Sequence, residues 1–273
     1  MRKKLQKPLG YLFLTLMTLV MFVPLYTVFV MGTYYSEEIF KGGLPLWFSN
    51  YFSQNFQVVM QKNYGQAYLN SLLVSLLSVV LSVSTSVLIG YAIAKFEFRL
   101  KKFLHFFIII TMMVPSQIMI IGYVREMRVF GLMSSLWPLA FVWMAMPFGA
   151  FFMTQFIQDA VPTEVMESAR IDGCSEPRIL ISIVVPFIRP AILTVSLLVL
   201  LWSWNSFMIP LVIVNKQSLY TIPLMVSTLS TVFRTDYGAI MCALSISILP
   251  IIAVFCLASK NFVQGIANGA VKG

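Results

Sequence analysis

Charge is the scarcest property of this sequence. Of its 273 residues only 11% are charged, whereas 59% are hydrophobic and the mean hydropathy is +0.87. A soluble domain carries about 25% charged residues, because it must cover its surface with groups that water solvates. The composition therefore excludes a soluble enzyme, a disordered chain and a nucleic-acid-binding domain, and it indicates a polytopic membrane protein.

Groups that bind metals or perform acid–base chemistry are also few. The chain has one histidine, His105, and three cysteines, Cys174, Cys242 and Cys256, without C-x-x-C or another metal-ligand spacing. It also lacks a G-x-x-x-x-G-K-[ST] loop that would bind nucleotide phosphates. We therefore expect no catalytic residue, no metal site and no cofactor in this chain.

Apolar stretches long enough to cross a bilayer recur six times. They lie at about 10–34, 68–94, 103–124, 133–157, 190–213 and 237–259, and none contains Asp, Glu, Lys or Arg. The sequence therefore predicts an all-α membrane protein with six transmembrane helices. The first stretch is too long for the apolar region of a signal peptide, so we expect it to remain as a span.

The basic residues predict the orientation of these spans. With a cytoplasmic N-terminus, 13 of the 19 Lys and Arg residues lie on the cytoplasmic side. This bias follows the positive-inside rule and accounts for the net charge of +9 without a nucleic-acid partner. Both termini are expected in the cytoplasm.

The absence of charge within the spans bears on the source of energy. Ion-coupled transporters usually hold ionisable residues inside the bilayer, which disfavours a self-contained secondary transporter, although backbone carbonyls can bind sodium. A membrane-embedded enzyme is disfavoured because no His, Cys or carboxylate cluster accompanies the spans. Prolines inside the predicted spans indicate either simple bends or kinked helices around a pathway that opens and closes. They include Pro24, Pro115, Pro147, Pro210 and Pro250.

The segment 158–189, predicted to lie in the cytoplasm between the fourth and fifth spans, holds half of the acidic residues. Thr163 is expected to cap a short helix, and Gly173 suits the left-handed conformation that ends one. Ser175 is expected to cap a second helix, which should stop before Pro186. This pattern predicts a compact helix–turn–helix that either packs on its own bundle or docks a cytoplasmic partner.

The run from Glu167 to Pro186 resembles the coupling loop of ABC-importer permeases. It reads Glu-Ser-Ala-x3-Gly-x9-Ile-x-Val-Pro, against the family pattern E-A-A-x3-G-x9-I-x-L-P, with Ser168 and Val185 as conservative departures. The resemblance implies that the short helix fits a cleft on an ATPase subunit and passes its closure to the membrane helices. The residues that it implicates in coupling are Glu164, Glu167, Ser168, Ala169, Asp172, Gly173, Ile183 and Pro186.

Further stretches resemble the MalG-type permeases of carbohydrate-uptake ABC importers. They are Asn70-Ser71, Gly90-Tyr-Ala-Ile-Ala-Lys95, Trp202-Ser-Trp-Asn-Ser-Phe-Met-Ile-Pro210 and the C-terminal end, so that the resemblance covers about 66–273. It implies a bacterial cell-membrane assembly with a second permease, two ATP-binding cassette subunits that bind the ATP, and an extracytoplasmic solute-binding protein. It also implies that the tail contacts the ATPases through Gly269, Lys272 and Gly273.

The predicted organisation has three parts: a first span with its outer loop over 1–65, a permease core over 66–260 and a cytoplasmic tail over 261–273. Five residues of the fifth span are candidates for lining a solute pathway, with helix packing as the alternative. They are Trp202, Ser203, Trp204, Asn205 and Ser206. Uncharged spans favour a neutral solute such as an oligosaccharide, with glycerol phosphate or another polar solute as the alternative. The outer stretch 35–67 is expected to face the second permease or the binding protein.

Overall fold

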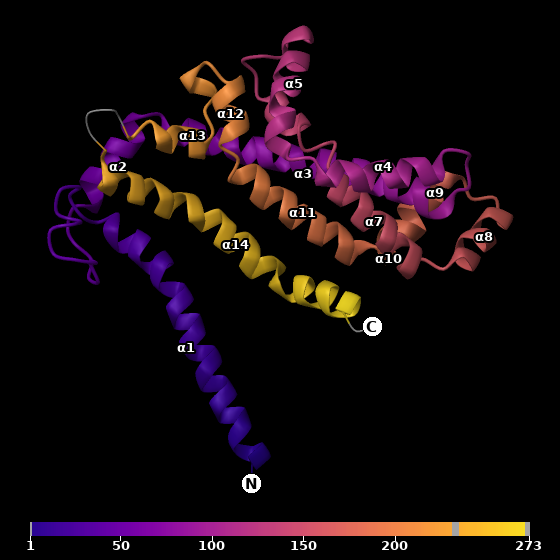
Figure 1. The fold of residues 1–273 in the computed structure, drawn as a ribbon, viewed down its shortest axis with the longest axis horizontal. Coiled ribbons are helices and arrows are strands. Elements are labelled where there is room, and N and C mark those ends of the chain that lie inside the picture. The colour runs from indigo at the N-terminus through magenta and orange to yellow at the C-terminus, as the bar shows by residue number, and fades with distance from the viewer. Residues whose placement is uncertain (1, 231–234, 271–273) are drawn as a thin grey trace. The chain divides into compact units, whose positions relative to one another are not determined.

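A computed structural model of the chain describes residues 2–230 and 235–270 (Figure 1). Within these ranges the regular structure is helical, apart from one antiparallel bridge between Ser230 and Thr235. The all-α prediction is therefore confirmed. The helices are α1 (Arg2–Met31), α2 (Phe52–Gln61), α3 (Tyr64–Lys95), α4 (Lys101–Met113), α5 (Ser116–Val129), α6 (Trp137–Phe141), α7 (Pro147–Ala160), α8 (Thr163–Ile171), α9 (Glu176–Ile179), α10 (Val185–Phe187), α11 (Arg189–Trp204), α12 (Met208–Ile213), α13 (Ile222–Ser227) and α14 (Tyr237–Ala270). A π-helix (Leu180–Val184) joins α9 to α10, and a 3₁₀ turn (Gln217–Leu219) precedes α13.

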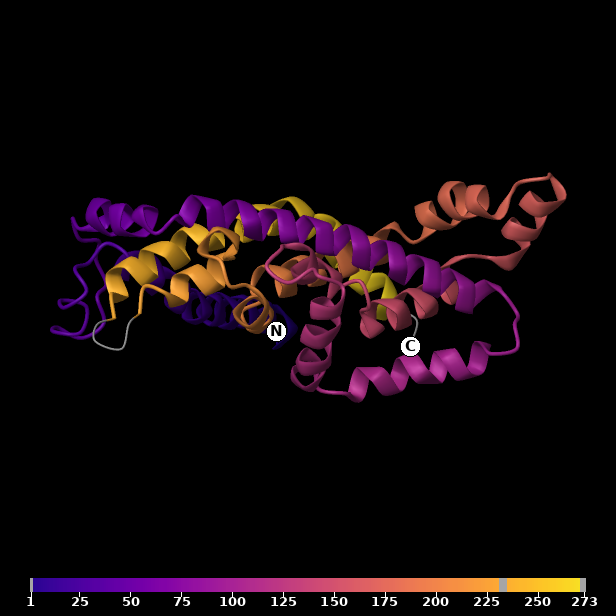
Figure 2. The same cartoon turned by 90° about the horizontal axis from the view of Figure 1, so that it is seen from above.

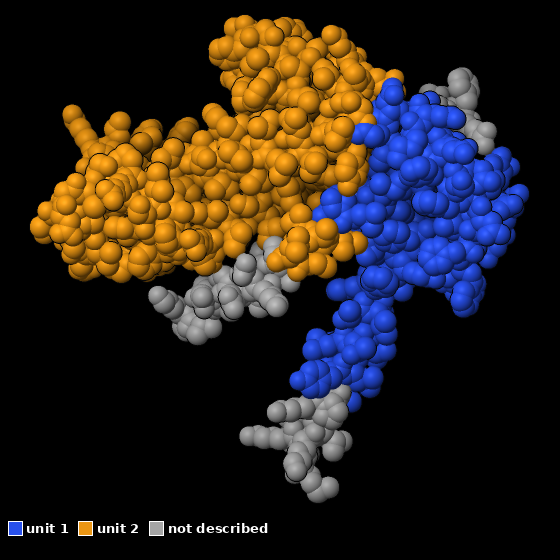
Figure 3. All heavy atoms as spheres, turned by 180° about the vertical axis from the view of Figure 1, so that it is seen from behind, with its two compact units in different colours: residues 1–65, 224–250 blue, residues 66–223, 251–273 orange. Residues whose placement is uncertain are grey.

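The chain forms two compact units (Figure 3). Unit 1 comprises residues 1–65 and 224–250, and unit 2 comprises residues 66–223 and 251–273. Unit 2 contains the segment that resembles a coupling loop and the candidate pathway residues of the fifth predicted span.

Three helical stretches in the described residues are long and apolar enough to cross a membrane. They are Leu9–Met31, Tyr64–Lys95 and Tyr237–Leu257. Two further pairs meet the same criterion only when taken together across a sharp bend, of 106° between α4 and α5 and of 81° before α11. The structure thus holds three to five candidate spans, and the predicted count of six is not confirmed.

Prolines mark two places where the predicted spans break. Val114 is extended, as a residue before proline prefers, and α5 begins directly after Pro115, so that α4 and α5 meet at a sharp angle in Figure 2. The predicted span 133–157 is likewise divided into α6 and α7, with Pro147 as the first residue of α7. The prolines in these two stretches thus accompany breaks between separate helices, which are larger than simple bends. By contrast, Pro250 lies inside the continuous helix α14.

Unit 1 depends on a close approach between the end of α1 and the beginning of α14. A Cβ atom on Gly32 would lie 3.0 Å from the backbone nitrogen of Cys242, so a larger residue would force the two segments apart. The Tyr64 hydroxyl donates a hydrogen bond to the Ala243 carbonyl at 2.6 Å, and the Asn55 amide donates to the Gly32 carbonyl at 2.9 Å. These side chains give polar backbone groups the partners that an apolar environment does not supply.

The core of unit 2 extends from the long helices into the segment 163–188. Members from α7, α8, α9 and α11 are at most 1% exposed: Met153, Ile157, Met166, Ile179 and Val195. Burying one such side chain contributes about 1.5–3 kcal/mol. The coupling-loop segment is therefore packed as part of the bundle and is not a loose linker.

Two glycines allow α3 and α7 to approach closely within unit 2. A Cβ on Gly90 would lie 2.7 Å from the Cβ of Met153 and 2.9 Å from the backbone carbonyl carbon of that residue. A Cβ on Gly149 would collide with the Ser86 hydroxyl. The Met153 atoms that Gly90 faces are rigid, so this contact tolerates no added methyl group.

We expect Gly90→Ala to lower the thermal unfolding midpoint of the purified protein in detergent, because overpacking a tight contact costs about 1–3 kcal/mol. Gly65→Ala is the matched control in the same helix. No described atom lies within 4 Å of a Cβ at that position, and alanine is the better helix former by about 1 kcal/mol. Equal midpoints for Gly90→Ala and the wild type would contradict the tight contact between α3 and α7.

Candidate functional site

The turn after α8 is closed by two backbone hydrogen bonds around Gly173. This residue has φ +79°, the left-handed conformation that the sequence predicts. Its N–H donates to the Arg170 carbonyl, and the N–H of Cys174 donates to the Ala169 carbonyl, both at 3.0 Å. The pair of bonds satisfies carbonyls that the end of a helix otherwise leaves open, so the turn is a defined structure.

The predicted helix caps differ from those in the structure. Thr163 is the first residue of α8, Pro162 occupies the N-cap position, and no described side chain caps the helix. Thr163 as a cap is therefore wrong, because the helix begins one residue earlier than expected. Ser175 occupies the predicted N-cap position of α9, but its hydroxyl makes no capping bond within the described chain.

The second helix of the segment does not stop before Pro186. The chain passes from α9 through the π-helix into α10, and the Val185 N–H bonds to the Leu180 carbonyl five residues back. The wider π-turn shifts the hydrogen-bond register of the helix. Pro186 therefore falls in the first turn of α10, where its missing N–H costs no intrahelical hydrogen bond. The axis bends by 81° only at Ile188, before α11.

The residues that match the coupling-loop pattern fall into two sets. Ala169 is 8% exposed and belongs to the core of unit 2, and Ile183 is half-buried against that core. The others are exposed, namely Glu164, Glu167, Ser168, Asp172, Gly173 and Pro186. Within α8 itself, Ala169 thus packs the helix into the core, and Glu164, Glu167 and Ser168 belong to its exposed surface.

Sequence reasoning missed two exposed apolar residues of α8. Val165 is 40% exposed and Ile171 is 86% exposed. Together with Ser168 they recur at intervals of three residues, so they lie along one side of the helix. The spacing could have indicated this face, but a helix of nine residues offers too little periodicity to make it stand out.

A carboxylate joins the coupling-loop segment to α3 within unit 2. Glu176 accepts hydrogen bonds from the Tyr91 hydroxyl and from Nε of Arg170, both at 2.6 Å. The bond to Glu176 raises the pKa of the Arg170 guanidinium, a group that is charged at physiological pH in any case. The ammonium group of Lys95, the last residue of α3, donates to the Val161 carbonyl at 2.6 Å, two residues before α8.

Two of the pathway candidates are packing residues of unit 2. Within the predicted span 190–213, α11 ends at Trp204 and α12 begins at Met208. Trp204 is 4% exposed and meets the Tyr68 ring edge-to-face, with centroids 5.6 Å apart. The Ser203 hydroxyl lies 3.1 Å from that of Ser78 in α3. Both side chains point into the bundle.

The other pathway candidates lie nearer the surface. Trp202 is 43% exposed, stacks with Trp143 at 6.4 Å and meets the Phe148 ring edge-to-face at 6.3 Å. Asn205 is exposed and donates its amide to a carbonyl of its own helix at 2.8 Å, while Ser206 is half-buried. The structure therefore separates five neighbours in sequence into an inward pair and an accessible set.

The tail candidates lie at the edge of the described chain. Gly269 falls in the last turn of α14, and Lys272 and Gly273 lie outside the described residues. Among the residues that were described, no three His, Cys, Asp or Glu side chains come together as a metal site.

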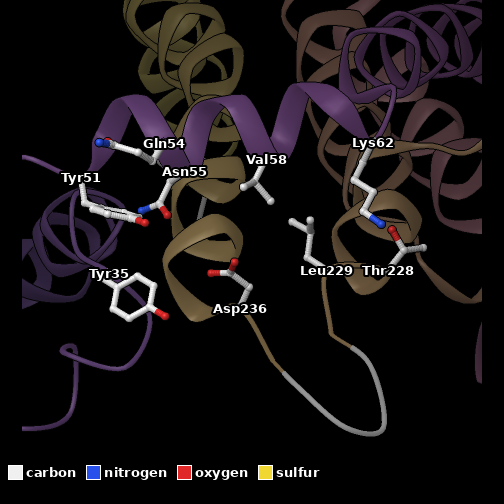
Figure 4. Close-up of a pocket in the computed structure, with 9 residues that line it drawn as sticks. All are labelled: Tyr35, Tyr51, Gln54, Asn55, Val58, Lys62, Thr228, Leu229 and Asp236. Atoms are coloured by element: carbon white, nitrogen blue, oxygen red, sulfur yellow. The ribbon is translucent and has the colours of Figure 1, made fainter.

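Unit 1 contains an open pocket of about 390 Å³ (Figure 4). Much of its polar lining supports the fold: Asp236 accepts a hydrogen bond from the Ala239 N–H at the start of α14, and the Tyr35 and Tyr51 rings meet edge-to-face at 5.2 Å. Most of the lining comes from the stretch 35–67. The lining residues are Tyr35, Tyr51, Gln54, Asn55, Val58, Lys62, Thr228, Leu229 and Asp236.

Residues 86–268, more than half of the chain, match the family of binding-protein-dependent transport system inner membrane components. The chain belongs to this family. The permease is 28% identical to the arabinooligosaccharides transport system permease protein AraQ of Halalkalibacterium halodurans, over 87% of this chain and 86% of that protein. It is 27% identical to the sn-glycerol-3-phosphate transport system permease protein UgpE of Pectobacterium atrosepticum, over 90% of each. The resemblance noted from the sequence is thereby confirmed.

The fold of the permease is also that of a solved transporter. A crystal structure of a bacterial ABC transporter involved in the import of the acidic polysaccharide alginate superposes with a TM-score of 0.80. The likeness covers 95% of this chain and 97% of that chain at 21% identity. It establishes the importer permease fold over 95% of the chain.

We expect Gly173→Val to open the turn after α8, whereas Gly173→Asn should keep it. A β-branched residue is strained at φ +79° by about 1–2 kcal/mol, whereas asparagine adopts this conformation readily. Hydrogen exchange at the Cys174 amide measures the opening, because this amide closes the turn. Equal exchange in both variants would show that the turn does not depend on the left-handed residue.

Proposed function

We propose that the permease is one membrane subunit of an ATP-driven importer for sugars, most simply oligosaccharides, and that ATPase subunits drive it through the segment 163–186. The family supports the importer assignment, and relatives named for arabinooligosaccharide transport support the solute class. The observation that carries the coupling role is the exposed face of α8, presented by a helix whose opposite side is built into the core of unit 2.

The exposed face of α8 has the character of a docking surface. Val165, Ser168 and Ile171 lie on the exposed side of α8, with the small residue between the two apolar ones, and Glu164 and Glu167 are exposed on the same side. An exposed isoleucine gains free energy when a partner covers it, and the flanking carboxylates would select basic groups on that partner. This combination suits a cleft on an ATPase subunit better than contact with water.

The assembly that follows contains a second permease, two ATP-binding cassette subunits and an extracytoplasmic solute-binding protein. ATP binds to the cassette subunits, and this chain needs no cofactor of its own. Both termini and α8 face the cytoplasm of a bacterial cell, in agreement with the bias of basic residues. Closure of the ATPases would switch the bundle between inward- and outward-facing states.

The accessible side of the α11 end is the proposed solute pathway in this chain. The Trp202 ring, backed by Trp143 and Phe148, offers an apolar face to a sugar ring, and Asn205, one turn further on, offers an amide. Ser203 and Trp204 shape this region from within by packing. The six apolar stretches predicted from the sequence carry no charge that would favour an ionic solute.

A second candidate solute is a glycerol phosphate. The similarity to the permease protein UgpE favours it, and a partner permease could supply the cation that a phosphate requires. Uptake of a labelled oligosaccharide and of labelled glycerol 3-phosphate by the complete importer in proteoliposomes separates the two. Transport of either solute by this chain alone, without ATPases, would contradict the proposed function.

We expect Ile171→Ser to weaken the binding of the ATPase subunits about tenfold, as loss of one buried aliphatic anchor does in protein interfaces. The measurement is the amount of ATPase that co-purifies with the permease pair at matched expression. Val129→Ser is the control, because Val129 is also an exposed aliphatic residue, at 78%, but lies in α5, outside the segment 163–186. Undiminished co-purification with Ile171→Ser would exclude this face as the docking surface.

We expect Trp202→Ala and Asn205→Ala to reduce solute uptake while the complex still assembles and hydrolyses ATP. The control is Trp137→Ala, which removes a half-exposed tryptophan of α6 outside this cluster. Trp204→Ala should instead lower the yield of folded protein, because it leaves a cavity beside Tyr68. Wild-type uptake by both pathway variants would mean that this face only packs against other chains.

A further inference from the structure

We propose that the Glu176 carboxylate clamps the coupling-loop segment to α3, so that α3 carries movement of α8 across unit 2. The inference rests on the proposed function, since it names the helix through which closure of the ATPase subunits is passed to the membrane helices. It concerns Tyr91, Arg170 and Glu176, none of which belongs to the exposed docking face of α8.

The clamp is a charge-assisted contact with a buried partner. Tyr91 is 6% exposed, and its hydroxyl donates to Oε2 of Glu176 at 2.6 Å, while Nε of Arg170 donates to Oε1 at 2.6 Å. Each carboxylate oxygen thus has its own donor, one from α3 and one from the last turn of α8. Hydrogen bonds to a charged group are about twice as strong as neutral ones.

An aromatic ring holds the clamp in position. Phe96, directly after α3, meets the Tyr91 ring edge-to-face at 5.2 Å and lies under the Arg170 guanidinium at 5.9 Å. A cation over a ring is attracted to its face and loses rotational freedom there. These ring contacts therefore orient both the tyrosine hydroxyl and the guanidinium toward Glu176 without the ATPase subunits.

The other end of α8 is fastened to the same turn of α3. The Lys95 ammonium donates to the Val161 carbonyl at 2.6 Å, ahead of α8, whereas Tyr91 reaches Glu176 after it. Between these two anchors, Met166 and Ala169 pack into the core that also contains Val87 and Tyr91 of α3. The backbone route to α11 passes instead through the π-helix and the 81° bend at Ile188. Of the two routes, α3 is the direct one.

Near its N-terminal end, α3 is hydrogen-bonded to the segment 218–222 of unit 2. The Asn70 amide donates to the carbonyls of Ser218 and Tyr220 at 2.8 and 2.9 Å, and the Ser71 hydroxyl accepts the Ile222 N–H at 2.8 Å. The anchors Asn70 and Lys95 are 25 residues apart along this helix, or about 37 Å at 1.5 Å per residue. A continuous helix fastened at both ends transmits a displacement of α8 to the segment 218–222.

The test is a double-mutant cycle on the complete importer in proteoliposomes. Tyr91→Phe removes the hydroxyl that donates to Glu176, and Glu176→Gln removes the charge that this hydroxyl meets, each with little change of shape. Glu97→Gln is the control, because Glu97 forms an exposed ion pair with Lys101, four residues further along the chain and outside the clamp. The measured quantity is solute molecules imported per ATP hydrolysed. A merely structural role leaves this ratio unchanged in every complex that assembles.

We expect Glu176→Gln and Tyr91→Phe each to lower this ratio about tenfold, the factor for losing a hydrogen bond to a charged group. The double variant should be no worse than either single one, because both remove the same contact, and Glu97→Gln should match the wild type. An unchanged ratio, strictly additive effects or a failure of Glu176→Gln to assemble would each overturn the clamp. Failure of the wild-type chain to bind ATPases or import solute would overturn the proposed function instead.

Discussion

Burial of one side of α8 in the core of unit 2 is the interaction on which the rest of the arrangement depends. Met166 and Ala169 pack with side chains of α3, α7 and α11, and this fixes which residues of a nine-residue helix remain outside. A short helix in water is marginal by itself, so its shape must come from such packing. The left-handed turn at Gly173 and the contact with Glu176 then hold its far end.

The bilayer imposes a second constraint, because backbone groups released by a break in a helix find no water there. In the permease the breaks at Pro115 and Pro147 fall between short helices, whereas α3 runs unbroken for 32 residues. Five buried serines lie along it, at intervals of three or four residues, where they allow neighbouring helices to approach; they are Ser71, Ser75, Ser78, Ser82 and Ser86. The unbroken helix α3 suits the transmission of movement proposed above, whereas the interrupted helices can change their angles at the breaks.

The end of α11 shows how one helix can serve both packing and access. Successive residues on a helix point about 100° apart, so one side of the helix can pack in the bundle while another stays accessible. Trp202 lies with Trp143 at the accessible side, and Ser203 and Trp204 point into the bundle. A pathway built from this helix therefore uses every third or fourth residue, and its shape depends on the residues between them.

Composition and spacing alone were enough to predict a helical membrane protein, its family and the left-handed glycine, because hydrophobicity, motif spacing and the φ preference of glycine are local properties. They also located the segment 163–186, although Thr163 as a cap and a stop before Pro186 were wrong. Only the tertiary structure showed which α8 residues are exposed, that the predicted spans break, and that Tyr91 meets Glu176 across 85 residues of sequence. Such contacts depend on how helices pack against one another, and side chains that meet only in the folded chain leave no periodic signal in the sequence.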